Sequence, residues 1–302
     1  MADTKEKTSA AKPPVYILGN TPLSQYLAAK FILNGENAVI IAPKQSCPTE
    51  IEISLREEHS LKKQKVSIPC RHYSLEKAKM LIITSPNSRL KSELMLLSVA
   101  HFSSAPVIVF SMISDFRIIE SLLKHSTVRA CFDGWLQTKD NQIFILGNEP
   151  QVTLSKPFNT LEYSLKALSY FHGAEILCQT CEDKNQVFWQ AFAGYAVSAL
   201  ASARYRQSIF NILKNKDKQN LIESAVSEIC ALAAAENVSL ASEDILKKIY
   251  NTPINYTYNT QTPGDSSKME LHNIYNIITN AARRHNLAVS TLKQLHPQDI
   301  SA

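Results

Sequence analysis

The chain has 302 residues, of which 45% are hydrophobic and 20% are charged, and its formal net charge is +5. This length allows two ordinary domains, and the apolar content is too high for a disordered chain. The basic residues are dispersed apart from two short lysine clusters, at residues 62–65 and 214–218, and no nucleic-acid-binding motif accompanies them. We therefore expect a globular protein that does not bind nucleic acid.

Two segments bear on targeting and membranes. Residues 1–14 are polar and rich in lysine, and they lack the apolar core of a signal peptide, so we expect a disordered leader. The most apolar stretch, residues 187–203, is interrupted by polar side chains and is, at about 17 residues, short for a membrane-spanning helix. It is more typical of a buried helix. We expect no membrane span and a cytoplasmic protein.

Six cysteines are scattered along the chain, and Cys178 and Cys181 form a CxxC motif. A structural zinc site needs four ligands, and neither a second CxxC nor a pair of histidines at ligand spacing accompanies this motif. The sequence therefore predicts no metal site. It leaves a redox role for the CxxC open, beside the simpler interpretation of two partly buried thiols.

The N-terminal part begins with a strand–helix–strand unit. Residues 15–18 form a short apolar run that ends at Gly19, which is typical of a buried strand. Pro22 suits the first turn of a helix, and Asn34-Gly35 ends that helix. Residues 38–41 form the next strand. This order predicts the first βαβ unit of a doubly wound sheet.

The alternation continues as far as the middle of the chain. We expect strands and helices in turn, at residues 80–83, 90–100, 107–110, 115–124 and 128–132. Two further strands, at 142–146 and 151–154, flank Gly147-Asn148, a predicted hairpin turn. Strands that alternate with helices indicate a parallel sheet, so we predict a Rossmann-type α/β domain over residues 15–157.

After residue 157 the pattern becomes helical. A short strand is expected at residues 175–178, and helices are expected at 161–171, 186–203, 205–213, 217–236, 242–250 and 267–286. The second domain, residues 158–302, is therefore predicted to be all-helical.

The turn after the first strand is the candidate cofactor site: Gly19, Asn20, Thr21, Pro22, Leu23 and Ser24. A dinucleotide fingerprint has small residues at its first, third and sixth positions, for the tight turn, the approach of the pyrophosphate and helix packing. Gly19 and Ser24 meet this demand. Thr21 places a branched Cβ where the phosphates come close, and Pro22 removes an N–H from the helix start.

The second strand bears on the choice of cofactor. No acidic residue follows it to hold a ribose 2′-hydroxyl, whereas Lys44 could meet a 2′-phosphate. If a cofactor binds, we expect it to be NADP, held weakly. A βαβ unit without any ligand is the other interpretation.

Two segments of the second half carry a family resemblance. Residues 270–289 read Glu-Leu-His-Asn-Ile-Tyr-Asn-Ile-Ile-Thr-Asn-Ala-Ala-Arg-Arg-His-Asn-Leu-Ala-Val, which resembles the Thr-Glu-Ile-Asp-Tyr-Ile-Asn-Gly helix of ketopantoate reductases. Phe188-Trp189-Gln190-Ala191-Phe192 resembles the Trp-x-Lys-Leu opening of an interface helix of that family. The order of elements agrees, so the resemblance covers about residues 15–295.

The resemblance implies the reduction of 2-dehydropantoate, or a related 2-keto acid, with NADPH, a step of pantothenate biosynthesis. It also implies a homodimer through the helical domain. In the family a lysine protonates the developing alkoxide, helped by a glutamate and by asparagines and a serine that hold the substrate. A positioned proton donor is worth about 10²–10⁴-fold in rate.

Most of the family's polar positions are replaced here. The glutamate corresponds to Glu270, which is kept, but the lysine corresponds to Ala191 and the two asparagines to Tyr195 and Ala199. The serine corresponds to Tyr258, with Thr257 beside it. An Asn-Gly pair and a second lysine correspond to residues 112–113 and 85–86, where neither is present.

The phenol of Tyr195 or Tyr258 could replace the lost proton donor, and Lys184 or Lys268 could reach the site from elsewhere. The ordinary pKa of tyrosine is about 10, which makes it a weaker acid. Glu270 and Tyr195 are therefore the candidate catalytic residues, and Thr257 and Tyr258 the candidate substrate contacts. Two functions stay open: an altered NADP-dependent reductase, and a non-catalytic pseudoenzyme that uses the fold to bind a ligand or a partner protein.

Overall fold

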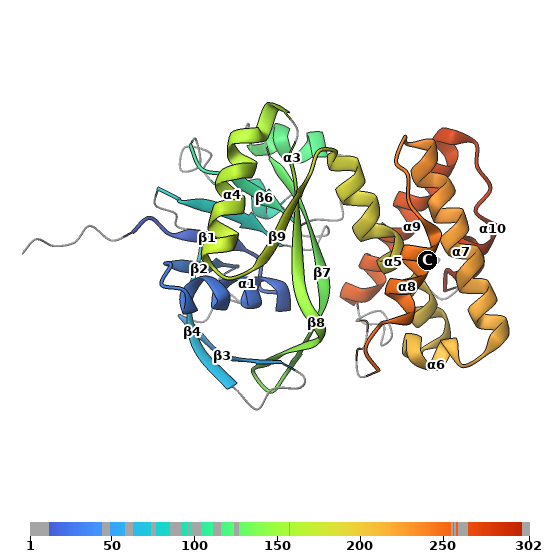
Figure 1. Ribbon diagram of the computed structural model, residues 1–302, viewed down its shortest axis with the longest axis horizontal. Helices are drawn as coiled ribbons and strands as arrows, with labels where there is room; N and C mark the ends of the chain where they lie inside the picture. Colours follow the sequence, from blue (N-terminus) through green and yellow to red (C-terminus); the bar gives the residue numbers. More distant parts are fainter. Residues whose placement is uncertain are drawn as a thin grey trace, which may run out of the picture.

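The computed structural model describes residues 12–43, 49–57, 63–73, 77–84, 92–95, 97, 104–110, 116–123, 127–156, 158–254, 256, 258 and 265–297. In these residues a sheet with its covering helices is followed by a bundle of helices (Figure 1). This arrangement confirms the predicted fold class, an α/β sheet followed by a helical C-terminal region. Residues 1–11 of the predicted leader lie outside the described part.

The predicted βαβ unit is present at the start of the chain. Strand β1 (Val15–Leu18) is buried along its whole length, and it pairs in parallel with β2 (Ala38–Ile41). Helix α1 (Pro22–Leu33) connects them, and its apolar side packs on the sheet through Leu27 and Phe31. An unbroken apolar run suits a strand that is covered on both faces, which is the reason that β1 was recognisable from the sequence.

Six strands form a parallel sheet in the order β4-β2-β1-β5-β6-β7, in which each neighbouring pair is parallel. The four strands not yet defined are β4 (Lys63–Arg71), β5 (Met80–Ile83), β6 (Val107–Val109) and β7 (Val128–Lys139). This is the strand order of dinucleotide-binding Rossmann folds. The order places the turn after β1 beside the point where the direction of strand addition reverses.

Three further strands make the sheet mixed. β3 (Glu50–Glu57) pairs antiparallel with β4, and β8 (Gln142–Ser155) pairs antiparallel with β7. β8 also pairs in parallel with both β3 and β9 (Leu177–Cys181). A purely parallel sheet was therefore too simple a prediction, because the pairs of β3 and β8 were not recognised.

The predicted hairpin turn at Gly147-Asn148 is wrong. The chain reverses instead at Asp140 and Asn141, whose φ angles of 50° and 55° are left-handed. Residues of this kind tolerate that conformation because their short polar side chains can hydrogen-bond locally. Gly147, with φ 69°, lies inside β8, where the register slips between Asp133 and Trp135 of the facing strand. Gly147 therefore allows the irregular backbone of β8 at this register shift.

The core of the sheet extends beyond residue 157. Helix α4 (Leu161–Gly173) and strand β9 follow β8, and Ala167, Phe171 and Ile176 are buried in the core that α1 and β1 share. The division of the chain after residue 157 stays a prediction. We propose a boundary after Cys181 instead, because α4 and β9 pack in the core of the sheet.

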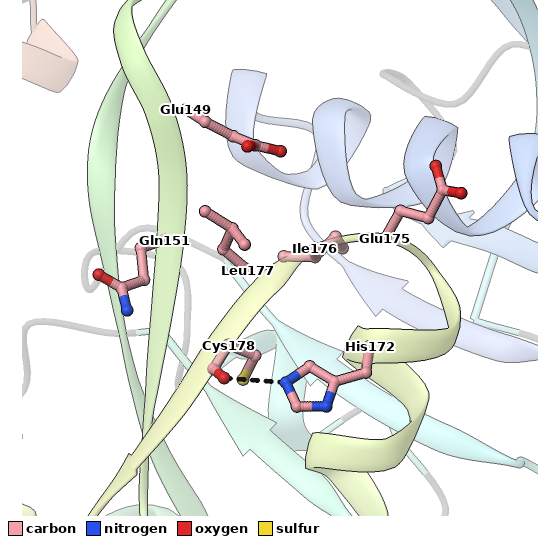
Figure 2. A pocket seen from close by; sticks show the side chains of 7 residues that line it. All are labelled: Glu149, Gln151, His172, Glu175, Ile176, Leu177 and Cys178. Atoms are coloured by element: carbon pink, nitrogen blue, oxygen red, sulfur yellow. Dashed lines mark hydrogen bonds between the residues drawn. The ribbon is translucent and has the colours of Figure 1, made fainter.

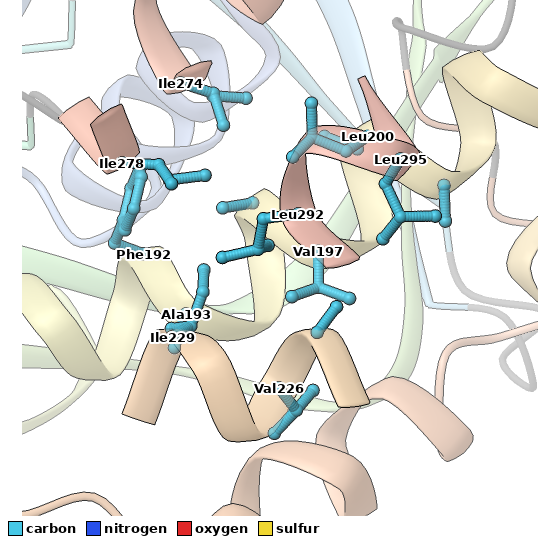
Figure 3. Packing of buried hydrophobic residues seen from close by; sticks show 14 of the residues in the cluster. Phe192, Ala193, Val197, Leu200, Val226, Ile229, Ile274, Ile278, Leu292 and Leu295 are labelled. Carbon is cyan, nitrogen blue, oxygen red and sulfur yellow. The ribbon is translucent and has the colours of Figure 1, made fainter. Parts of the chain in front are cut away.

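The helical region is organised around α5 (Lys184–Tyr205), which Asp183 caps by accepting a hydrogen bond from the Asn185 amide. Around it lie α6 (Ile209–Leu213), α7 (Lys216–Ala235), α8 (Ser242–Tyr250), α9 (Asp265–His285) and α10 (Ser290–Leu295). Figure 3 shows their apolar side chains meeting in one core, which contains Phe192, Ile229 and Leu292. Among the described residues no helix is long and apolar enough to cross a membrane.

Candidate functional site

The turn after β1 leaves the strand through a glycine with positive φ. Gly19 has a φ of 109°, a conformation that favours glycine, and its amide donates to the carbonyl of Ile41 at 2.9 Å. The side chain of Asn20 accepts a hydrogen bond from Gln25 at 2.8 Å. The first fingerprint position is therefore conserved in its structural role, the tight exit from the strand.

The start of α1 is closed by a capping box of Thr21 and Ser24. The Thr21 hydroxyl accepts from the Ser24 amide at 3.1 Å, and the Ser24 hydroxyl accepts from the Thr21 amide at 2.6 Å. The Ser24 hydroxyl in turn donates to the Thr21 carbonyl at 2.7 Å, and Ser24 is fully buried. Such a box satisfies amides that a helix start otherwise offers to water or to an anion.

This turn does not fit a dinucleotide pyrophosphate. The amides of Thr21 and Ser24 donate within the capping box, and Pro22 has no amide hydrogen. Of residues 21–24, Leu23 alone has an amide outside the box. Lys44, the predicted partner of a 2′-phosphate, lies outside the described residues, so its role stays a prediction.

The two candidate catalytic residues lie in contact. Tyr195 of α5 and Glu270 of α9 are 75 residues apart in sequence, and the Tyr195 hydroxyl donates a hydrogen bond to Oε1 of Glu270. Burial, the charge of Glu270 and this hydrogen bond together raise the pKa of Tyr195 well above its ordinary value. Burial also raises the pKa of Glu270, against the opposing effect of the Tyr195 hydrogen bond.

Two more tyrosines, from the segment between α8 and α9, complete this cluster. The ring of Tyr258 lies 6.0 Å from that of Tyr195, and the ring of Tyr256 lies edge-on to Tyr258 at 5.0 Å. Tyr258 is only 8% exposed. Burial raises its pKa, while the neighbouring side chains of Ser198, Thr252 and Trp135 lower it. We call Tyr195, Tyr256, Tyr258 and Glu270 the tyrosine cluster.

Of the other candidate positions, those that the structure describes bring no proton donor to this cluster. Ala191 and Ala199 lie on α5, and Ala199 is fully buried. Lys184 pairs instead with Glu120 of α3 (Phe116–Leu123) at 3.8 Å. Lys268 is an exposed residue of α9. Thr257 and residues 85–86 and 112–113 lie outside the described part.

Two contacts near the cluster were not anticipated from the sequence. Tyr256 was missed, although its spacing of two residues from Tyr258 was a visible signal. Lys248 of α8 pairs with Asp133 of β7 at 2.7 Å and so joins the helical region to the sheet. Nothing in the sequence indicated this ion pair, because its partners are 115 residues apart.

The raised pKa of Glu270 predicts an effect of pH on stability. A carboxyl group whose folded pKa lies above its unfolded value stabilises the protein at low pH and loses that contribution as pH rises above about 4.5. Glu270→Gln removes the buried charge and keeps a hydrogen-bond acceptor for Tyr195. We expect the free energy of unfolding of this variant, relative to that of the wild type, to increase as pH rises from 4 to 8. Urea denaturation at each pH measures both values.

Glu223→Gln is a matched control for this experiment. Hydrogen bonds from Tyr250 and Gln219 lower the pKa of Glu223, which is a surface residue, so its substitution should give a small change of the opposite sign. Equal behaviour of the two variants at all pH values would contradict the assignment of Glu270 as a buried acid.

A hollow of about 480 Å³ lies at a different place, beside β8, β9 and the end of α4 (Figure 2). It is lined by Glu149, Gln151, His172, Glu175, Ile176, Leu177 and Cys178. A ring nitrogen of His172, Nε2, is 2.9 Å from the carbonyl oxygen of Cys178. None of the tyrosine-cluster residues lines this hollow, so the two features are separate.

The CxxC motif lies along β9, and its geometry does not suit a disulfide. Residues three apart in a strand point to opposite faces, and their Cα atoms are about 10 Å apart, beyond the roughly 7 Å that a disulfide spans. Both thiols are free. Burial raises the pKa of Cys178 to about 12, which disfavours the reactive thiolate. Among the described residues no group of three or more metal-binding side chains occurs.

Comparison with known sequences identifies the helical region. Residues 183–297 match the family described as ketopantoate reductase PanE/ApbA C terminal. The matched segment begins at Asp183, the cap of α5, and ends after α10. A comparison with curated protein sequences finds no significant match.

Solved structures resemble the chain over nearly its whole length. A 2-dehydropantoate 2-reductase from Geobacter metallireducens GS-15 is 14% identical with a TM-score of 0.75, over 93% of this chain and 97% of that one. D-mandelate dehydrogenase in complex with NADH and anilino(oxo)acetate is 11% identical with a TM-score of 0.78, over 93% and 96%. A dimeric ketopantoate reductase from Staphylococcus aureus is 15% identical with a TM-score of 0.70, over 93% and 96%.

At this level of identity the structures establish the fold, and the sequence match establishes the kinship of the helical region. Both point to the same proteins, in agreement with the resemblance of residues 188–192 and 270–289. The helical region, residues 183–297, is therefore related to the C-terminal part of the ketopantoate reductase PanE/ApbA family, and the whole chain has the fold of the ketopantoate reductases that it resembles.

Proposed function

We propose that this protein is a non-catalytic member of the ketopantoate reductase family, which keeps the fold to bind a ligand or a partner protein. The observation that carries the proposal is the tyrosine cluster. Tyr195 and Tyr258 stand where the resemblance places a substrate-holding asparagine and serine, and Tyr195 is hydrogen-bonded to Glu270. Because the Tyr195 hydroxyl and the Glu270 carboxylate are hydrogen-bonded to each other, this pair offers little to a small keto acid.

The proton chemistry supports the same conclusion. The family's lysine corresponds to Ala191, whose methyl group cannot donate a proton. The Tyr195 phenol is a poor substitute, because its pKa is raised well above the ordinary value by burial and by the neighbouring carboxylate. An acid this weak transfers its proton with little driving force near neutral pH.

The nucleotide turn adds an independent argument. A pyrophosphate at the start of α1 would have to compete with the hydrogen bonds of the capping box. We therefore propose that NADP binding is weak.

A second candidate function is the reduction of a 2-keto acid other than 2-dehydropantoate, with NADP as cofactor. The observation that favours it is the contact between Glu270, the family glutamate, and the hydroxyl of Tyr195. In that case Tyr195 would hold the proton for the substrate oxygen, and Tyr258 would narrow the substrate site. Such an enzyme would be cytoplasmic and could form a homodimer through the helical region, as the Staphylococcus aureus relative is dimeric.

The two candidates differ in turnover. Purified protein is incubated with NADPH and a series of 2-keto acids, including 2-dehydropantoate, and the loss of NADPH absorbance is followed. Non-catalytic function predicts no loss above the blank, at least about 10²–10⁴-fold below an enzyme that keeps its acid. Oxidation that Tyr195→Phe abolishes, in a variant that melts like the wild type, would instead support the reductase.

A further inference from the structure

At the start of α1, the strand order is that of a nucleotide-binding fold, but the residues of the turn do not suit a nucleotide. The strand order and Gly19 build the place at which Rossmann folds receive a pyrophosphate. At that place an anion is normally held by backbone amides of the first helical turn, aided by the helix dipole. The question is what satisfies those amides in this protein.

We propose that the Thr21–Ser24 capping box has taken the place of the nucleotide pyrophosphate, so that the protein folds with this site closed and without a nucleotide. The box is reciprocal: each hydroxyl accepts from the other residue's amide, at 3.1 Å and 2.6 Å. The proposal concerns nucleotide binding alone and does not rest on the proposed loss of catalysis.

The burial of Ser24 makes the closure part of the packing. Ser24 is fully buried, and its hydroxyl also donates to the Thr21 carbonyl at 2.7 Å. Opening the box for a phosphate would therefore leave the buried Ser24 hydroxyl without its hydrogen-bond partners, which is costly. The box thus differs from a flexible side chain that a ligand could push aside.

Two further features act in the same direction. Pro22 has no backbone N–H, so this position of the helix start cannot donate a hydrogen bond to a phosphate. The β-branched side chain of Thr21 is held by its hydrogen bond to the Ser24 amide, so its Cβ and methyl group stay at the turn. Three changes at residues 21, 22 and 24 should therefore be enough to reopen the site.

The experiment compares NADPH binding by the wild type with that of an opened variant, Thr21→Gly/Pro22→Ala/Ser24→Ala. NADPH fluorescence is titrated with full-length protein, and melting curves are recorded with and without NADPH. We expect the opened variant to bind NADPH at least about tenfold more tightly than the wild type, a difference of about 1.4 kcal/mol. We also expect NADPH to raise the melting temperature of the opened variant alone.

Asn215→Ala is the matched control. Asn215 caps α7 by accepting from the Lys218 amide at 3.0 Å, so the variant loses a helix cap of the same kind in the helical region. It should melt at a lower temperature than the wild type, as the opened variant should without NADPH, but its NADPH binding should be unchanged. A gain in binding by the control would overturn the proposal.

Other results would also overturn it. Micromolar binding of NADPH by the wild type, with no gain in the opened variant, would show that the box does not close the site. If the triple variant does not fold, Thr21→Gly and Pro22→Ala are titrated singly, and the absence of a gain in both would have the same meaning. Tight binding of NADPH by the wild type, without NADPH oxidation, would contradict this proposal and leave the proposed non-catalytic function intact.

Discussion

Replacing Phe192 with alanine is expected to lower the free energy of unfolding by about 3–5 kcal/mol. Phe192 is fully buried in the core of the helical region, stacked on Phe188 at 5.1 Å and edge-on to Trp189 at 5.8 Å. Its removal loses both the transfer of the ring from water and the contacts around it, and aromatic pairs add about 0.5–1.5 kcal/mol. The free energy of unfolding of natural proteins is only about 5–15 kcal/mol, so the variant should be close to unfolding.

Urea denaturation measures this change, and Met269→Ala provides the comparison. Met269 also lies in the helical region, but 48% of it is exposed, so its substitution should change the free energy by no more than about 0.5 kcal/mol. A loss below about 1 kcal/mol for Phe192→Ala would mean that the ring is not part of a packed core.

Tyr258→Ser is the second large effect that we expect, about 3–5 kcal/mol of destabilisation. The variant places a serine where the resemblance to the family implies one. In this protein, however, the Tyr258 ring is buried against Tyr195 and Tyr256. A serine would leave a cavity between these rings, because the helices around it can close only partly.

Tyr258→Phe separates packing from hydrogen bonding. It keeps the ring and removes the hydroxyl that lies near Ser198 and Thr252, so about 0.5–1.5 kcal/mol should be lost. If Tyr258→Ser were as stable as the wild type, the tyrosine would have to line an open site, and the argument for a closed cluster would fail.

The elements that could be predicted from the sequence are those with an unbroken local signal. β1 and β2 are short apolar runs between glycine, proline and asparagine breaks, and α5 is a long apolar stretch. β4 was missed although its buried residues alternate, Val66, Ile68 and Cys70, because a serine and a proline lie between them and two lysines precede them. The hairpin was misplaced because Gly147 looked like a turn residue, whereas its left-handed backbone belongs to an irregular strand.

The sequence points to individual residues of the candidate site but not to their arrangement. The resemblance singled out Tyr195, Tyr258 and Glu270, and the structure brings all three together. Their contacts depend on how α5, α9 and the segment before α9 pack, which no local pattern encodes. The capping box, in contrast, has a local signal. Thr21 and Ser24 are three residues apart, which is the spacing of a capping box.

The central claim is that the site has lost the chemistry of its family, and the formation of pantoate tests it most directly. Purified protein at high concentration is incubated for hours with NADPH and 2-dehydropantoate, and pantoate is measured by mass spectrometry beside a ketopantoate reductase as positive control. We predict no pantoate above the protein-free blank. Pantoate that accumulates in proportion to protein concentration, and that Glu270→Gln or Tyr195→Phe abolishes, would contradict the claim.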